Sequence, residues 1–183
     1  MKRVYKEHPY QWPIIGSIDH LNAATDDEFV DFYKTFYVPN NAVLSIAGDI
    51  QIEEAKKMIE MYFGGIPKGT REIPRPSVVE PPLEKQVRDV VYDNIQLPAV
   101  IQAFRIPKQG TDDYYAIDML ATLLSRGESS RLIKSVKDEQ QKALSVGTFP
   151  INMEDPGVIL AFGIANIGVE PKDLESAMNA EYV

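Results

Sequence analysis

The chain of 183 residues contains no cysteine, and only two of its residues are histidines. The lack of cysteine excludes disulfide bonds, thiolate metal sites and a cysteine nucleophile, and it leaves the cellular compartment open. No apolar run reaches the ~18 residues of a membrane-spanning helix, so we expect no membrane span. Basic residues are also scarce, because 19 Lys and Arg stand against 27 Asp and Glu, a formal net charge of -8. Phosphate binding needs clustered basic residues, so no nucleic acid is expected as the main partner.

Motifs that carry chemistry are missing as well. No glycine-rich loop has a phosphate-binding pattern, and no Gly-x-Ser-x-Gly occurs. Residues 4–8 end like an inverted zinc motif, His-x-x-Glu-His, with Glu80 and Glu84 as conceivable distal ligands. Zinc needs two histidines one helical turn apart, whereas the first position here is Val4 and Pro9 follows the second. We therefore predict no catalytic residue and no metal ligand within this chain.

Proline is abundant in one stretch. Residues 67–82 hold five of the 13 prolines. Because proline fixes φ and removes a backbone donor, this stretch cannot form a helix or a central strand. Each proline also biases the preceding residue towards an extended conformation. We predict a semi-rigid, Pro-rich linker at 67–82, between a first portion at 1–66 and a second at 83–183.

Before the linker, the pattern predicts a helix, a strand and a second helix. Residues 25–28, Thr-Asp-Asp-Glu, have the form of a capping box, and an aromatic face follows at helical spacing through Tyr37. The apolar residues 42–47 predict a buried strand, and residues 52–62 predict an amphipathic helix ended by Gly64. Three elements are too few to close a core. We therefore expect one apolar face to be poorly covered and to associate with another surface, namely that of Phe29, Phe32 and Phe36.

After the linker, strands and helices alternate. Strands are predicted at 86–92, 99–106, 144–149 and 158–165. Helices are predicted from 110–113 onward, from an N-cap at Ser129, and from Pro171 as a first helical residue. The mostly apolar strand 99–106 is expected to be buried on both faces. The first helix is expected to use Ile117, Leu120, Ala121 and Leu124 as its core face, and the last uses Leu174, Ala177 and Met178.

Several segments, taken in order, resemble the pitrilysin/insulinase family of zinc metallopeptidases, which includes mitochondrial processing peptidase and bacterial two-domain peptidases. The resemblance rests on His8-Pro9-Tyr10, Pro13-Ile14-Ile15-Gly16, Phe32-Tyr33, Tyr37-Val38-Pro39-Asn40-Asn41-Ala42, Ala47-Gly48-Asp49, Tyr62-Phe63-Gly64-Gly65-Ile66-Pro67, Pro98-Ala99, Gly127-Glu128-Ser129-Ser130-Arg131-Leu132 and Asp155-Pro156-Gly157. It implies an α+β fragment of two homologous α/β-sandwich domains, each a largely antiparallel sheet packed with helices. Residues 1–66 would be the C-terminal portion of the first, zinc-type domain. Residues 67–82 would be the linker, and 83–183 the N-terminal portion of the second domain.

The resemblance also implies a function for the parent protein. In this family an inverted His-x-x-Glu-His on a helix of the first domain, with a second Glu further along, holds zinc, and the motif Glu is the general base for water. Both segments would lie upstream of Met1, so this chain alone is expected to bind no catalytic zinc and to be inactive. The intact parent is expected to be a zinc-dependent endopeptidase that cleaves peptides or unfolded segments in a closed chamber. A second homologous subunit, identical or a sibling, would complete the chamber. A soluble protein of the cytoplasm or the bacterial periplasm is compatible with this sequence.

Two positions carry a further implication. In the non-zinc half of such enzymes, the stretch after the Ser-Arg-Leu helix typically ends in an Arg and, seven residues later, a Tyr that help to hold the substrate. The matching positions here are Lys137 and Leu144. Lys keeps the charge without the planar fork of Arg, and Leu offers no hydroxyl to an oxyanion. The departure suggests a zinc-carrying parent whose partner supplies the Arg and Tyr. The competing interpretation is a solvated Lys137 and a core Leu144.

Two other hypotheses stay open. The chain could belong to a non-catalytic homologous subunit that acts as a structural or peptide-binding partner, which an upstream sequence without His-x-x-Glu-His would favour. It could also be a self-contained α+β interaction domain, which predicts a monomer that unfolds in one cooperative transition. The predicted last helix runs into Val183, which indicates a piece of a longer protein.

Overall fold

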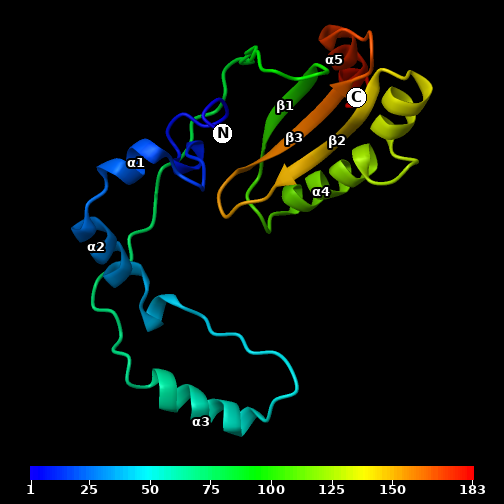
Figure 1. Ribbon diagram of the computed structural model, residues 1–183. Helices are drawn as coiled ribbons and strands as arrows, with labels where there is room; N and C mark the ends of the chain where they lie inside the picture. The colour runs from blue at the N-terminus through cyan, green and yellow to red at the C-terminus, as the bar shows by residue number, and fades with distance from the viewer. The chain divides into compact units, whose positions relative to one another are not determined.

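The computed structural model describes residues 1–183, which divide into two compact units, 1–82 and 83–183 (Figure 1). Unit 1 contains helices and no strand, whereas unit 2 contains helices and a three-stranded antiparallel sheet. The predicted α+β class is therefore confirmed. None of the helices combines the length and apolar character needed to cross a membrane.

The helices of unit 1 are short. They are η1 (Pro9–Gln11), α1 (Ile18–Ala23), α2 (Asp26–Phe36), η2 (Pro39–Asn41) and α3 (Ile52–Phe63). The predicted capping box starts α2, because the Glu28 carboxylate accepts from the Thr25 N–H at 2.8 Å and Thr25 Oγ1 accepts from the Glu28 N–H at 3.4 Å. The second predicted helix is α3, and it ends before Gly64 as expected. Residues 67–82 form neither helix nor strand.

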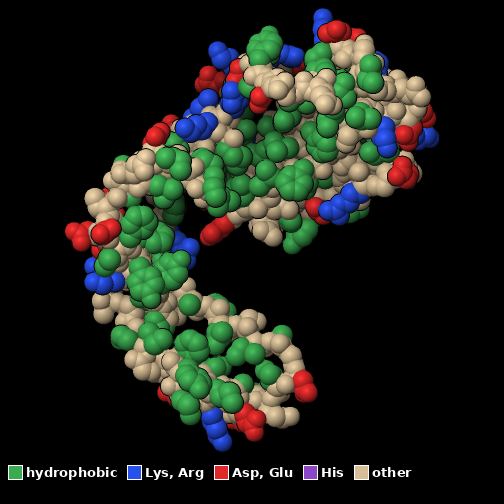
Figure 2. All heavy atoms as spheres, in the orientation of Figure 1, with side chains coloured by type: hydrophobic (Ala, Val, Ile, Leu, Met, Phe, Trp, Pro, Cys, Tyr) green, Lys and Arg blue, Asp and Glu red, His purple; other side chains and the backbone are tan.

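The strand predicted at 42–47 is wrong. These residues form no strand, and Val43 is 96% exposed. A strand needs a neighbour to bond its backbone N–H and C=O groups, and unit 1 has no other strand. The expectation of a poorly covered aromatic face holds for Phe29 and Phe32, each 56% exposed, while Phe36 is partly buried. Figure 2 shows apolar side chains at the surface around α2 and α3.

The sheet of unit 2 has the order β1-β3-β2, with β3 antiparallel to both neighbours. The strands are β1 (Ala99–Ile106), β2 (Ala143–Ile151) and β3 (Gly157–Ala165), and the helices are α4 (Asp112–Ser125), the π-helical η3 (Leu132–Glu139) and α5 (Pro171–Ala180). β2 and β3 form a hairpin, while α4 and η3 lie between β1 and β2 along the chain. α4 begins after Thr111, whose side chain accepts from the Tyr114 N–H, and α5 begins at Pro171 as predicted.

The core of unit 2 lies between one face of the sheet and the helices α4, η3 and α5. Small residues of β3, Ala161 and Ala165, meet large residues of the helices there. The fully buried members include Leu132, Val136, Leu174 and Met178. A Cβ added at Gly163 would lie 2.8 Å from Met178 Sδ, so the missing side chain lets α5 approach the sheet closely.

The second face of the sheet is covered by no helix of unit 2. Ile101 of β1 pairs with Phe162 of β3, and their side chains are 70% and 36% exposed. Phe149 of β2 is 60% exposed. The prediction that β1 is buried on both faces is therefore wrong, because helices pack against one face only. Figure 2 shows apolar side chains gathered over this sheet.

Three further expectations for unit 2 are corrected. Residues 86–92 form no strand because they pair with no strand of the sheet, whose order is β1-β3-β2, and Arg88 instead forms an ion pair with Glu175 of α5. Ser129 is not an N-cap, because η3 begins at Leu132 without a side-chain cap. Leu120 is 41% exposed instead of buried, and it lines a cavity between α4 and the sheet.

Candidate functional site

The two candidate positions lie on consecutive elements that pack together. Leu132 and Val136 of η3 share the buried core with Ala143 and Val146 of β2. Lys137 follows Val136 in η3 and is partly buried, whereas Leu144 is 56% exposed. Leu144 therefore does not belong to the buried core of this structure.

Each of these positions lies at a local irregularity. η3 is wound with the longer π-type spacing, as shown by the Gln140 N–H bond to the Ser135 carbonyl at 2.9 Å. Short π-helical turns are rare and occur frequently at functional sites. β2 changes register between Ala143 and Ser145, so Leu144 is the extra residue of a β-bulge. Bulges re-aim side chains and are enriched beside active sites. Sequence spacing had no signal for either irregularity.

Hydrogen bonds hold the turn between the two positions. The Lys142 N–H donates to the Val136 carbonyl at 2.9 Å, which closes the turn after η3. Gln141 has φ +50, and Asn166 Nδ2 donates to its carbonyl at 3.0 Å. A non-glycine residue pays conformational strain in this left-handed region, so these bonds help to keep the turn in place. The site thus offers one cation and one apolar group on a defined turn, without a nucleophile or a general base.

The residues of the incomplete zinc motif have other partners. The Glu80 carboxylate accepts from the backbone N–H groups of Lys6, Glu7 and His8 at 2.7, 2.9 and 2.8 Å. His8 Nδ1 accepts from the Tyr10 N–H at 3.2 Å. No group of three or more His, Cys, Asp or Glu residues could hold a metal ion. The side chains of this chain therefore do not fit a zinc site.

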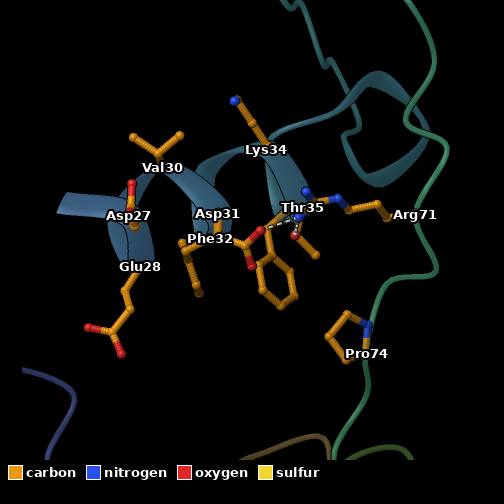
Figure 3. Close-up of a pocket in the computed structure, with 10 residues that line it drawn as sticks. Asp27, Glu28, Val30, Asp31, Phe32, Lys34, Thr35, Arg71 and Pro74 are labelled. Atoms are coloured by element: carbon orange, nitrogen blue, oxygen red, sulfur yellow. Dashed lines mark hydrogen bonds and ion pairs between the residues drawn. The ribbon is translucent and has the colours of Figure 1, made fainter. Parts of the chain in front are cut away.

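A groove of about 700 Å³ lies in unit 1 between α2 and residues 71–74 (Figure 3). Arg71 extends across it, with Nη1 donating to the Asp31 carboxylate and to Thr35 Oγ1, the latter at 3.0 Å. Apolar side chains of α2, such as Phe32, complete the lining. Sequence reasoning missed this groove, because Arg71 and Asp31 are 40 residues apart. Arg71 is the only arginine that lines the groove, and its bonds to Asp31 and Thr35 are structural contacts. Arg71 therefore supplies no reactive group to the groove.

A smaller cavity of about 170 Å³ lies in unit 2 between α4, the sheet and Tyr182, the residue that follows α5. Its walls are almost entirely apolar, with Phe104, Leu124 and Ile159 among them. The Tyr182 hydroxyl donates to Gln102 Oε1 at 2.7 Å. Burial raises the pKa of Tyr182 to about 12, so this hydroxyl stays neutral at physiological pH. The cavity therefore presents no ionised group to a ligand.

Comparison with curated proteins finds relatives over almost the whole chain. This chain is 26% identical to "Zinc protease PqqE" of Helicobacter pylori over an alignment of 178 residues. The alignment covers 96% of this chain and 40% of that protein. This chain is 26% identical over 166 residues to "Uncharacterized zinc protease YmxG" of Bacillus subtilis, which covers 88% of this chain and 38% of that protein. The chain thus spans about two fifths of the length of these relatives.

Solved structures also match this chain over almost its whole length. "The crystal structure of a protease from Helicobacter pylori" matches with a TM-score of 0.88 and 26% identity, over 97% of this chain and 43% of that chain. A peptidase M16 inactive domain from Pseudomonas fluorescens matches with a TM-score of 0.76 and 19% identity, over 99% of this chain and 44% of that chain, which shows a shared fold. The family described as "Peptidase M16 inactive domain" matches residues 23–181. Because this match covers most of the sequence, the chain belongs to the M16 peptidase family, in the group described as its inactive domain.

Proposed function

We propose that this chain is part of a zinc-dependent endopeptidase and supplies the region that joins two homologous domains. The observation that carries the proposal is the likeness to the Helicobacter pylori protease, with a TM-score of 0.88 over 97% of the chain at 26% identity. The relatives named as zinc proteases support the choice of metal. In this proposal residues 1–66 close the first domain, 67–82 link the domains, and 83–183 open the second.

Zinc in such an enzyme would activate a water molecule for attack on a peptide carbonyl. The residues of this chain do not fit that role, so the zinc ligands would belong to a part of the protein outside residues 1–183. What this chain would contribute is a scaffold and a surface for the substrate. Lys137 would donate to an acceptor of a bound peptide, and Leu144 would contact an apolar side chain. A second homologous subunit would supply the Arg and Tyr that these positions lack and would close the chamber.

The metal and the activity can be tested separately. Residues 1–183 alone are expected to bind no stoichiometric zinc and to leave a quenched fluorescent peptide intact. The whole protein that contains them is expected to hydrolyse the peptide, to lose activity on chelation and to regain it with zinc. Hydrolysis by residues 1–183, or by a whole protein free of zinc, would contradict the proposal.

The candidate positions have a matched control on the same helix. Lys134 and Lys137 both belong to η3 and carry the same charge. In the whole protein, Lys137→Ala is expected to raise KM about two- to fivefold, the size of one partly exposed charge contact, while Lys134→Ala leaves it unchanged. Equal effects of the two substitutions would remove Lys137 from the substrate surface.

A second candidate is a non-catalytic homologous subunit. The match to a family described as an inactive domain favours it, as does the lack of a metal-binding cluster in residues 1–183. The sequence of the whole protein discriminates the two functions, since the enzyme requires an inverted His-x-x-Glu-His motif and the partner subunit does not. A whole protein that lacks the motif but binds peptides would establish the second function.

A further inference from the structure

Side chains of α2 and the following turn bind the Pro-rich segment to unit 1. The Gly69 N–H donates to Asn40 Oδ1 at 2.8 Å. Two residues further on, Arg71 donates to the Asp31 carboxylate and to Thr35 Oγ1. These bonds join segments 29 to 40 residues apart in sequence, so they are tertiary contacts. The first part of the segment is therefore attached to unit 1 at two points.

Glu80 attaches the far end of the same segment. Its carboxylate accepts three backbone N–H groups, those of Lys6, Glu7 and His8, at 2.7 to 2.9 Å. Hydrogen bonds to an ionised acceptor are about twice as strong as neutral ones. The N-terminal turn and the end of the Pro-rich segment are thus held together within unit 1.

Residues 83–87 differ from the segment before them. They belong to no helix or strand, and their side chains are exposed. No hydrogen bond or ion pair involves them. Arg88 comes directly after them and forms an ion pair with Glu175 of α5, both in unit 2. Residues 83–87 are therefore the least restrained part of the connection.

We propose that residues 67–80 form a strap fixed to unit 1, and that residues 83–87 are the hinge between the two units. Prolines pre-set φ, so ordering the strap loses less chain entropy than ordering an ordinary segment of that length. Residues 83–87, Leu-Glu-Lys-Gln-Val, contain no proline and keep their backbone freedom. The sequence predicted one semi-rigid linker at 67–82, whereas the contacts fix residues 67–80 to unit 1 and leave the movable joint to residues 83–87. This inference goes beyond the proposed function and does not rest on it.

Trypsin distinguishes strap from hinge, because both contain exposed cleavage sites. Lys68 and Arg71 lie in the strap and Lys85 lies in the hinge. Proteolysis of a folded protein follows the local opening of the backbone, so restrained sites are cut slowly. In the chain of residues 1–183, cleavage after Lys85 is expected at least about tenfold faster than after Lys68 or Arg71. Mass spectrometry would show the products 1–85 and 86–183 first. Cleavage in the strap at an equal or higher rate would overturn the proposal.

Two variants test the attachment without removing a trypsin site. Asp31→Ala releases Arg71, and it is expected to speed cleavage after Arg71 about two- to fivefold while cleavage after Lys85 is unchanged. Asp27→Ala makes the same charge change on the same helix, forms no bond to the strap, and is expected to have no such effect. Equal effects of the two variants would overturn the attachment at Arg71.

Hydrogen exchange gives an independent measurement, first on the unmodified chain. The amides of residues 6–8 and of Gly69 are expected to exchange more slowly than those of residues 83–87. The Glu80→Ala variant is expected to speed exchange at residues 6–8 and to leave Gly69 unchanged. Uniformly fast exchange over residues 6–8, 69 and 83–87 would show that no strap exists.

Discussion

Replacing Gly163 with alanine tests how α5 is held against the sheet of unit 2. The added Cβ would lie 2.8 Å from Met178 Sδ and 3.1 Å from Leu174 Cδ2. Both side chains are fully buried, so they cannot move into solvent to make room. Either α5 must shift away from the sheet or the side chains must leave their preferred rotamers.

The expected magnitude follows from two opposing effects. Alanine restricts the unfolded chain more than glycine does, which stabilises the fold by about 0.5–1 kcal/mol. Overpacking a well-filled core costs about 1–3 kcal/mol. The Gly163→Ala variant is therefore expected to lower the free energy of unfolding by about 0.5–2 kcal/mol.

Gly147 provides a matched control in the same sheet. A Cβ there would lie 3.2 Å from Phe162 Cε1, and this ring is 36% exposed and can swing outward. The entropic gain is the same and the movement of the ring offsets part of it, so the Gly147→Ala variant is expected to leave the free energy of unfolding unchanged or to raise it by up to about 1 kcal/mol. The contrast between the two glycines isolates the packing of α5.

Urea unfolding followed by far-UV circular dichroism measures both variants. A double-mutant cycle with Met178→Ala identifies the cause, because removing Met178 makes room for the new Cβ. Met178→Ala alone is expected to cost about 2–5 kcal/mol, and the double variant should be more stable than the sum of the single effects by at least about 0.5 kcal/mol. A neutral or stabilising Gly163→Ala, or strict additivity with Met178→Ala, would refute the packing described for α5.

Three other predictions concern titration and exposed surface. Burial raises the pKa of Tyr182 to about 12, so the folded chain keeps a proton that the unfolded chain loses, and stability should fall as pH rises from about 10 to about 12. In urea titrations, Tyr182→Phe should reduce this loss of stability by about 1 kcal/mol, a value lowered to allow for the partial exposure of the ring. An unchanged loss of stability in the variant would contradict the assignment. Hydrogen bonds from the Thr25 backbone and side chain lower the pKa of Glu28. The stabilisation of α2 by these bonds is therefore complete above the usual carboxylate pKa, and it is lost as pH falls through the lowered pKa. Thr25→Ala should reduce the helical circular dichroism at pH 7 and flatten its loss on acidification, whereas an unaltered acid profile would argue against the capping box. The paired change of Phe29 and Phe32 to serine should weaken self-association of the chain in light scattering, because it removes exposed aromatic surface, and a compact monomer before the change would contradict the expectation.

Local signals predicted the parts of the fold that depend on neighbours within one turn. The capping box at Thr25 and the start of α5 at Pro171 are both present, since each rests on bonds or dihedral angles of adjacent residues. The predicted strands at 99–106 and 158–165 appear in the sheet because they find each other as partners. The segments 42–47 and 86–92, also predicted as strands, have no partner strand and form none.

For the candidate positions, sequence order allowed the M16 family to be recognised and directed attention to Lys137 and Leu144. It contained no sign of the π-helical turn of η3 or of the bulge at Leu144, and the bulge depends on how β2 pairs with β3, a strand further along the chain. The role of the two residues stays a prediction that the KM comparison of Lys137 and Lys134 addresses.

The sequence by itself determined the α+β class, most helices and the family, because helix caps, proline stops and apolar spacing act over a few residues. Only the tertiary structure decided which predicted strands pair, which sheet face is covered and where the Pro-rich segment is attached. The pairing of Arg71 with Asp31 spans 40 residues and that of Glu80 with Lys6 spans 74. Contacts over such separations depend on the path of the whole intervening chain, and no local pattern encodes that path.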